Sequence, residues 1–341
     1  MVKTTVKDVA RKSGFSPATV SRALNNNYPV KKETKEKIQK AVDELNYTRN
    51  ANARNLRVKN SDLIALVVAD INNPYFSRIA KYLGDGLFEK GYSLIVCNTN
   101  ESVDKEKQVL NTLVSKGVRA IVMSSVLTDL NFIHQLQKKD IKIVLLDRNI
   151  ELLDIPFVGS ANFDETKRLT EYLLKNGHEN IIFVAGPKQT VTSQERFQGF
   201  YSTILESGLD FEKNCKILQG NYTGEQAYKT TIEFLKKDFS KNAKYTALIS
   251  SNNLMTAGIL EATQRLNIKV PEDLSIVSFG KIEGQELIKP KITCISQDVN
   301  AIAQQTLSKL LEVINSDPRE TIKSVFIHDN FIEGDSVRKI L

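Results

Sequence analysis

Residues 6–25 read Val6-Lys7-Asp8-Val9-Ala10-Arg11-Lys12-Ser13-Gly14-Phe15-Ser16-Pro17-Ala18-Thr19-Val20-Ser21-Arg22-Ala23-Leu24-Asn25, and this stretch determines how the N-terminal part of the chain folds. Val6, Val9 and Ala10 recur at helical spacing and would face one side of a first helix. Gly14 suits the left-handed position just after a helix, because glycine adopts that conformation without a Cβ penalty. The pattern therefore predicts a short helix that ends near Gly14.

A second helix is predicted directly after this turn. Ser16 is a favoured N-cap residue, and Pro17 suits the first helical position, where no backbone N–H is needed. The buried face of this helix continues through Val20, Ala23 and Leu24. A third amphipathic helix follows, with a buried stripe made of Ile38, Ala41, Val42 and Leu45. Two short helices joined by a tight turn with glycine are typical of a helix-turn-helix, and the third helix completes a small core.

The charge distribution of the chain indicates a polyanionic partner. The 341 residues carry a formal net charge of +7. Residues 1–59 hold 14 Lys and Arg against 5 Asp and Glu, a balance of +9, while the remaining residues sum to −2. A solvated basic arm is the simpler alternative, but the helical pattern of the same segment favours a nucleic-acid-binding module. The length is sufficient for two or three folding units, and the 41% hydrophobic content supplies their cores.

The start of the second predicted helix carries the candidate DNA contacts, because this part of a helix-turn-helix enters the major groove. The residues that lie off its apolar face are Pro17, Ala18, Ser21 and Arg22. Arg22 can form a bidentate contact with guanine, and Ala18 can pack on a thymine methyl group. Ser16 and Thr19 suit phosphate oxygens. For each of these residues, an exposed helix position without a DNA contact is the alternative.

Four ordered stretches of the N-terminal segment match one known family. They are residues 6–10, 14–25, 46–47 and 50–57. These stretches resemble the headpiece of the lactose/galactose (LacI/GalR) repressor family, in which the last one is a hinge helix that forms only on DNA. The resemblance implies a DNA-binding headpiece at 1–48 and a hinge helix with linker at 49–59. The DNA-binding residues that it implies are Ser16, Pro17, Ala18, Thr19, Ser21, Arg22, Asn25, Asn50, Ala53, Arg54, Leu56 and Arg57.

Leu56 falls at the position of the leucine that wedges into the central base step in this family. Such an apolar wedge partly unstacks the step and bends the duplex. A hinge segment this short is not a stable isolated helix, so we expect it to fold on binding DNA, with Arg54 and Arg57 at phosphates. Two departures from the family weaken capping and pre-organisation but leave the DNA contacts in place. They are Lys31, where Ser or Thr is frequent, and Arg49, where Pro is common.

From Asp62 onward, apolar runs alternate with helical patterns. The strand-like runs are 63–69, 94–96, 120–123, 143–146, 181–184, 247–249 and 276–279. The alternation predicts a doubly wound α/β fold. The family resemblance implies a body like the periplasmic sugar-binding proteins, with two doubly wound subdomains, three crossings and ligand between them. We place this effector-binding and dimerisation domain at 60–341, with subdomains at about 60–160 plus 292–320 and 161–291 plus 321–341.

Polar and aromatic residues follow several predicted strands, where ligands bind in sheets of this kind. Sugar hydroxyls are recognised by planar hydrogen-bonding groups, and sugar C–H surfaces by aromatic rings. The residues that best match the family's effector contacts are Arg196, Tyr222, Asn252 and Gln297. The second choices are Asn73, Tyr75, Phe76, Asp147 and Arg148. A structural ion pair is the alternative for Asp147 with Arg148, and core packing is the alternative for Tyr75 and Phe76.

One segment of the body departs from the family. Many sugar-responsive members have an aspartate after the position of Phe279, where this chain has Gly280-Lys281. The change removes a typical acceptor for a sugar hydroxyl. If Lys281 points inward, it favours an anionic ligand such as a sugar phosphate or a sugar acid. A solvated Lys281 that points outward is the alternative.

An enzyme and an exported sugar-binding protein are the competing classes. The sequence has no dinucleotide-binding glycine motif, P-loop or nucleophile elbow. Its three histidines lack metal-ligand spacing, so we expect neither a metal nor a cofactor. The cysteines are widely spaced and odd in number, which fits a reducing cytosol. Without an export signal or an apolar run of ~20 residues, we expect a cytoplasmic protein with no membrane partner.

The sequence thus predicts a repressor of carbohydrate-use genes that acts as a homodimer on a pseudo-palindromic DNA operator. A bound sugar or sugar derivative would move the hinge helices, with a coupling free energy of ~1–3 kcal/mol. We favour release of DNA by the ligand over corepression. The alternatives are a protein corepressor, as in a carbon-catabolite branch of the family, and a sugar-binding protein without DNA affinity. No heptad tail precedes Leu341, which favours a dimer over a tetramer.

Overall fold

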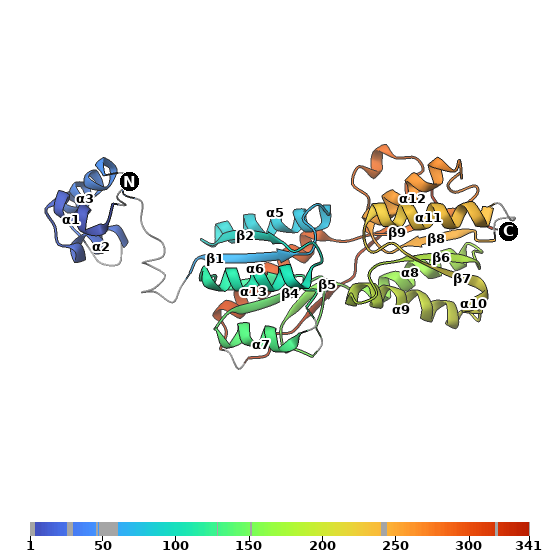
Figure 1. Cartoon of the computed structure of the whole chain (residues 1–341), viewed down its shortest axis with the longest axis horizontal. Helices are drawn as coiled ribbons and strands as arrows, with labels where there is room; N and C mark the ends of the chain where they lie inside the picture. Colours follow the sequence, from blue (N-terminus) through green and yellow to red (C-terminus); the bar gives the residue numbers. More distant parts are fainter. Residues whose placement is uncertain are drawn as a thin grey trace. The chain divides into compact units, whose positions relative to one another are not determined.

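The computed structural model describes residues 4–25, 30–45, 47, 61–127, 129–150, 152–239, 244–317 and 320–340. They belong to two compact units, Met1–Ser61 and Asp62–Leu341, both drawn in Figure 1. Each unit has hydrophobic cores of its own. The predicted hinge helix, with Asn50, Ala53, Arg54, Leu56 and Arg57, lies outside the described residues.

The described part of the N-terminal unit is helical. Its helices are α1 (Val6–Ser13), α2 (Pro17–Asn25) and α3 (Lys32–Glu44). Gly14 ends α1 with a φ of 76°, and its N–H donates to the carbonyl oxygen of Ala10. Ser16 caps α2, since its Oγ accepts a hydrogen bond from the backbone N–H of Thr19 at 3.1 Å. Lys31 precedes α3 without a side-chain cap. The predicted helix-turn-helix is confirmed.

The first lobe of the second unit is a parallel six-stranded sheet of order β11-β5-β4-β3-β1-β2. Its strands are β1 (Leu63–Val68), β2 (Ser93–Asn98), β3 (Ala120–Met123), β4 (Lys142–Leu146), β5 (Phe157–Ser160) and β11 (Val325–Ile327). The helices α5 (Pro74–Glu89) and α13 (Val299–Asn315) cover one face. The other face is covered by α6 (Val103–Ser115) and α7 (Leu130–Lys138).

The second lobe has the same layered form, with strand order β12-β10-β9-β8-β6-β7. Its strands are β6 (Ile181–Ala185), β7 (Cys215–Gln219), β8 (Ala247–Ser250), β9 (Ser275–Phe279), β10 (Thr293–Ser296) and β12 (Asn330–Ile332). All pairings are parallel except that of β12 with β10. One face packs against α8 (Asn162–Lys175) and α9 (Val191–Glu206), and the other against α11 (Gly224–Phe239) and α12 (Asn253–Arg265). Shorter helices are α10 (Phe211–Asn214) and the 3₁₀ helix Gln285–Leu287.

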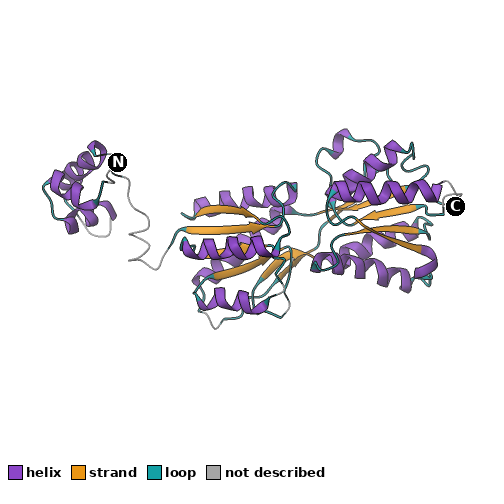
Figure 2. Cartoon of the chain, viewed as in Figure 1, coloured by secondary structure: helices purple, strands orange, loops and turns teal. Residues whose placement is uncertain are grey.

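Burial on both faces explains why the sequence of the central strands is apolar throughout. In β1, Ile64, Leu66 and Val68 pack toward α5 and α13. Ala65 and Val67 pack toward α6 and α7. Figure 2 shows the resulting layers, with helices on both sides of each sheet. The seven predicted strands are all present, and the doubly wound α/β prediction is confirmed.

The described chain passes between the lobes after β5, after β10 and after β11. The sequence-based edges put residues 292–320 in the first lobe and 321–341 in the second. The structure instead places β10 in the second sheet and β11 in the first. Both strands are short. β10 joins the second sheet by pairing with β9, from which a loop separates it. β11 joins the first sheet by pairing with β5, which is distant in sequence. The lobe boundaries therefore lie near 297 and 328.

Candidate functional site

The predicted DNA-contact residues that the structure describes lie at the N-cap and in the first turns of α2. Ser16, Pro17, Ala18 and Arg22 are exposed, and Thr19 and Ser21 are half-buried. Val20, Ala23 and Leu24 face the core of the unit. The side chain of Asn25, at the end of α2, is outside the described set. The exposed face of α2 therefore presents the polar residues and the arginine that major-groove reading requires.

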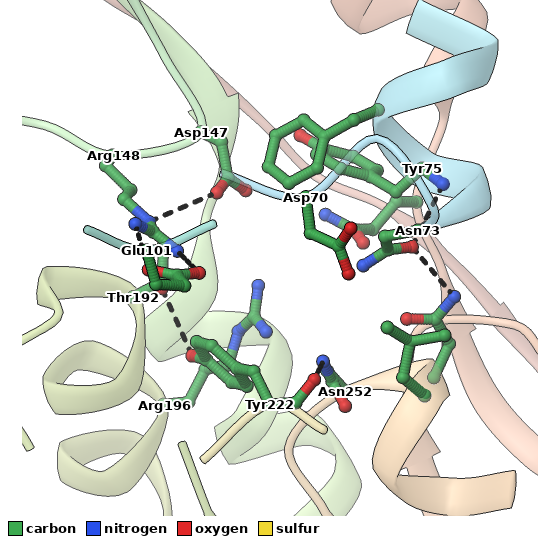
Figure 3. Close-up of a pocket in the computed structure, with 14 residues that line it drawn as sticks. Asp70, Asn73, Tyr75, Glu101, Asp147, Arg148, Thr192, Arg196, Tyr222 and Asn252 are labelled. Carbon is green, nitrogen blue, oxygen red and sulfur yellow. Dashed lines mark hydrogen bonds and ion pairs between the residues drawn. The ribbon is translucent and has the colours of Figure 1, made fainter. Parts of the chain in front are cut away.

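The second unit contains a cleft between its two lobes, with about 470 Å³ of space that is partly open to solvent. It is lined by Asp70, Asn73, Tyr75, Phe76, Glu101, Asp147, Arg148, Thr192, Arg196, Tyr222, Asn252, Asn253, Leu254 and Gln297 (Figure 3). Most of these residues follow the carboxyl end of a strand, as expected for sheets of this type. The structure brings together all nine residues that the sequence predicts for effector binding.

Arg196 is fixed from three directions. Its Nε donates to Asn162 Oδ1 at 2.8 Å, and its Nη1 donates to the carbonyl oxygen of Ser251 at 2.7 Å. The guanidinium lies 3.7 Å from the ring centroid of Phe279. Among the described residues, Nη2 has no hydrogen-bond partner, and Figure 3 shows the guanidinium rising into the cleft. Arg196 thus presents an oriented donor whose position is set before any ligand binds.

A buried acid and a tyrosine face Arg196 from the first lobe. Asp147 follows β4 with a φ of 65°, and burial raises the pKa of its carboxyl group against the opposing effect of Arg148 and Arg196. Burial also raises the pKa of Tyr75, with Asp147 adding to the effect. The hydroxyl of Tyr75 is buried without a hydrogen-bond partner among the described residues. Tyr75 and Phe76 belong to the lobe core as well as to the cleft wall.

Arg148 forms its principal ion pair with Glu101, a residue that the sequence reading did not assign. Nη1 donates to Glu101 Oε2 at 2.8 Å, and Nη2 donates to Oε1 at 2.6 Å. The contact with Asp147 is longer, with 3.8 Å between Arg148 Nε and Asp147 Oδ2. Burial lowers the pKa of Arg148, but the hydrogen bonds and negative charge of Glu101, together with the charge of Asp147, raise it overall.

Asn73 and Asn252 line the cleft and also cap helices. Asn73 caps α5 by accepting from the N–H of Tyr75 at 3.1 Å. Asn252 caps α12 by accepting from the N–H of Met255 at 2.8 Å, and its Nδ2 donates to the carbonyl oxygen of Tyr222 at 3.2 Å. Only one amide hydrogen of Asn252 therefore remains for a ligand. Contact of Asn252 with a ligand stays a prediction.

The ring of Tyr222 packs closely against the backbone at Gly186. A Cβ atom at that glycine would lie 2.4 Å from the tyrosine ring, so the close approach requires glycine. The Tyr222 hydroxyl bonds to Thr192 Oγ1 at 3.1 Å. Burial raises the pKa of the Tyr222 hydroxyl. The ring is thereby held as a fixed aromatic wall of the cleft.

The cleft residues that were not assigned from sequence are Asp70, Glu101, Thr192, Asn253 and Leu254. For two of them, the sequence contains a feature that could have identified them. Glu101 follows a predicted strand, and Thr192 precedes Arg196 by one helical turn. Gln297, which was assigned, donates from Nε2 to Ser160 Oγ at 2.9 Å, so it also joins two of the crossing segments.

Gly280 and Lys281 are the residues at which this chain departs from the family. Gly280 has a φ of 94°, which disfavours any residue with a Cβ. Lys281 pairs with Glu286, with 2.5 Å between Nζ and Oε1, and is not a cleft-lining residue. The inward lysine that would favour an anionic ligand is therefore not what the structure shows.

Outside the cleft lining, an acidic cluster of Glu165 and Asp329 lies at the crossings between the lobes. Glu165, which is fully buried, accepts hydrogen bonds from the N–H of Asp329 at 3.1 Å and from His328 Nδ1 at 3.3 Å. Asp329 Oδ1 accepts from the N–H of Asp298 at 3.0 Å, while Oδ2 is buried without a partner among the described residues. Burial raises the pKa of Asp329 to about 6, and the negative charge of Glu165 contributes.

Two further features are absent from the described residues. None of their helices is both long and apolar enough to cross a membrane. No group of three or more His, Cys, Asp or Glu in this part of the chain is arranged to hold a metal ion.

Comparison with known proteins assigns both units to one family. Residues 5–50 match the family model of bacterial regulatory proteins, lacI family. Residues 61–334 match the model of periplasmic binding proteins and the sugar-binding domain of the LacI family.

Curated relatives cover almost the whole chain. The HTH-type transcriptional repressor PurR of Vibrio vulnificus is 33% identical over 98% of this chain and 99% of its own. The ribose operon repressor of Halalkalibacterium halodurans is 30% identical over 94% of this chain and 93% of its own. A crystal structure of the lac repressor dimer bound to operator and the anti-inducer ONPF has the same fold, with a TM-score of 0.82, 22% identity, and coverage of 98% of this chain and 99% of that one. The chain therefore belongs to the LacI family of bacterial regulatory proteins, as a transcriptional repressor with a DNA-binding helix-turn-helix unit and a small-molecule-binding body.

Proposed function

We propose that this repressor binds an uncharged sugar or sugar derivative in the cleft and that this ligand controls its affinity for DNA. The observation that carries the proposal is the state of Arg196. Its guanidinium is buried, anchored by Asn162 and Ser251, stacked on Phe279, and open toward the cleft at Nη2. A donor held in this way binds a ring hydroxyl without further ordering of its side chain.

The rest of the cleft supplies the complementary groups of a polyhydroxyl site. Asp147 and Asp70 offer carboxylate acceptors, and Tyr222 offers an aromatic face for the C–H surface of a ring. Asp147 belongs to the first lobe and Arg196 to the second. A ligand that contacts both residues stabilises one arrangement of the lobes over others.

On the DNA side, we propose a homodimer that binds a pseudo-palindromic operator through α2 and the segment 49–59. The two-fold symmetry of a dimer requires the same symmetry in the site. The ligand is expected to release DNA, and the regulated genes to serve carbohydrate use, as the name of the ribose operon repressor indicates for that relative. The protein would act in the cytoplasm, as a binder and not as an enzyme.

The test is a thermal-shift screen of the full chain against neutral monosaccharides and disaccharides, followed by operator binding with each sugar that stabilises the protein. Arg196→Ala should bind DNA with wild-type affinity and lose at least roughly tenfold in sugar affinity, the scale of one charge-assisted hydrogen bond. Arg265→Ala removes an exposed arginine from the last turn of α12 and serves as the matched control. A wild-type sugar response in Arg196→Ala would contradict the site assignment.

A further inference from the structure

The cleft contains a basic side chain, Arg148, whose two terminal nitrogens are both hydrogen-bonded already. The side chain of Arg148 is 4% exposed, and both of its terminal nitrogens donate to the carboxylate of Glu101. This fork-to-fork geometry is also the geometry in which a guanidinium binds phosphate or a ligand carboxylate. Glu101 therefore occupies the position on Arg148 that an anionic ligand would take. Figure 3 shows the pair at the wall of the cleft beside Asp147.

The backbone places Glu101 there at a local energetic disadvantage. Asn100 and Glu101 have φ values of 54° and 57°, so two consecutive residues with side chains adopt the left-handed conformation after β2. Such residues persist only where their surroundings hold them. The bidentate bond to Arg148 is a contact that does so. The turn after β2 thus depends on the same pair that covers the arginine.

The charged groups around Arg148 carry no excess positive charge that would attract an anion. The cleft is lined by the carboxylates of Asp70, Glu101 and Asp147 and by the guanidinium groups of Arg148 and Arg196. Glu106 lies behind Arg148, where it accepts from Ser125 Oγ at 2.6 Å and from the N–H of Val126 at 2.9 Å. Lys281, which follows β9, does not line the cleft and pairs with Glu286.

We propose that Glu101 is the specificity-determining residue for ligand charge: by occupying both terminal nitrogens of Arg148, it keeps the cleft selective for uncharged polyhydroxyl ligands and excludes phosphate esters and sugar acids. The inference rests on the proposed function, since it takes the cleft as the effector site. It goes further, because it names the residue whose loss converts the site to anion binding. A purely structural pair would change stability when broken but would not change which ligands bind.

The test uses the full chain and inorganic phosphate as the probe, titrated at constant ionic strength with chloride as the replaced anion. The variant Glu101→Gln removes the charge and keeps the shape of the side chain. Glu206→Gln is the matched control, because Glu206 pairs with Lys167 at 2.6 Å on an exposed part of α9 outside the cleft. The double variant Glu101→Gln with Arg148→Met removes the cation that the proposal exposes. Glu101→Ser provides a second way to remove the carboxylate if the glutamine variant does not fold by circular dichroism.

The expected result is that Glu101→Gln or Glu101→Ser binds phosphate roughly tenfold or more tightly than wild type, since a charge in direct contact with the site is removed. The gain should be absent in Glu206→Gln and lost in the double variant. Equal phosphate affinity in wild type and Glu101→Gln, whether strong or undetectable, would overturn the proposal. A gain that survives Arg148→Met would overturn it as well. The phosphate titration uses no sugar, so its outcome does not depend on the sugar screen. A failure of sugar binding in that screen would refute the proposed function and leave the role of Glu101 in anion exclusion to the titration.

Discussion

Asn253 at the start of α12 donates a hydrogen bond from Nδ2 to Oδ1 of Asn73, 3.2 Å away, and this bond joins the two lobes across the cleft. The acceptor is the oxygen that also caps α5. A second contact between the lobes, the ion pair of Arg78 with Glu283, is longer at 3.9 Å and exposed at both side chains. The asparagine pair is therefore the closer direct link between the walls of the ligand site.

Asn253→Ala should loosen this arrangement without unfolding the protein. One neutral hydrogen bond contributes about 1 kcal/mol, so lobe opening should increase several-fold. Hydrogen exchange measured by mass spectrometry should become faster in peptides around residues 70–77 and 251–256 and stay unchanged in β1 and β6. Asn131→Ala, on the exposed face of α7, is the control. Unchanged exchange at both peptides would show that the asparagine bond does not hold the lobes.

Asp329→Asn should stabilise the second unit at neutral pH and not in acid. The pKa of Asp329 is about 6 in the folded protein, above its ordinary value of 3.8, so the folded state binds this proton more tightly than the unfolded state. The contribution of this group to stability is then greatest below about pH 4 and is lost as the pH rises through 6. The difference corresponds to about 3 kcal/mol, which is the upper limit of the gain for asparagine at pH 7.5.

Urea unfolding at pH 4.5 and pH 7.5 measures this effect. The gain of Asp329→Asn over wild type should be larger at pH 7.5, and Asp335→Asn, at an exposed position of the same segment, should show no such difference. The bond from the N–H of Asp298 is retained by the amide oxygen of asparagine. Parallel pH dependences for wild type and Asp329→Asn would refute the assignment of the proton to this residue.

Gly258→Ala should destabilise the second lobe although alanine is the better helix former. An added Cβ at Gly258 would lie 2.0 Å from the carbonyl oxygen of Gly224, so the backbones of α11 and α12 would have to separate. Overpacking of this kind costs typically 1–3 kcal/mol. Gly84→Ala, in α5, meets only the tip of Leu94 at 3.4 Å and should be neutral or stabilising by up to about 1 kcal/mol. Chemical denaturation of both variants tests the contrast, which equal midpoints would contradict.

Arg22→Ala should reduce sequence preference more than it reduces overall DNA affinity. A bidentate contact to a base contributes about 1–3 kcal/mol of discrimination, whereas a phosphate contact weakens binding to all sequences alike. Selection of bound sequences from a random DNA pool should yield a two-fold symmetric site for wild type and a degenerate position for the variant. Lys40→Ala, on the exposed side of α3, should leave the selected site unchanged. An identical site for Arg22→Ala would remove this residue from base reading.

Local patterns were sufficient to predict the helix-turn-helix and the central strands. The cap at Ser16, the left-handed Gly14 and the apolar run of β1 each depend on a few neighbouring residues. The strands β5, β7, β10, β11 and β12 were not predicted. Two of them, β11 and β12, have three residues each, and β11 pairs with a strand more than 160 positions away. No local periodicity reports such a pairing.

Contacts between residues that are distant in sequence were also not predicted for the side chains of the candidate site. The sequence correctly groups the residues after the strand ends into one cleft, since parallel strands bring their carboxyl ends to one edge. For Arg148, it gave an ion pair with the adjacent residue Asp147 as the alternative to ligand contact. The structure gives Glu101, 47 positions away, as the close partner. The ion pair with Asp147 is also present but longer, at 3.8 Å, so adjacency in sequence did not identify the closest partner.

The three crossings between the lobes also determine how this protein can be recombined. Neither lobe is encoded by one continuous stretch of the gene, because α13 and β11 return to the first lobe and β12 returns to the second. A chimaera that takes ligand specificity from a relative must therefore exchange the body from residue 62 onward as a single block. The helix-turn-helix unit can be replaced through one junction near Ser61, where the two compact units divide. A single junction therefore exchanges the DNA-binding unit without changing the ligand site. The two lobes that form the ligand site must be exchanged together.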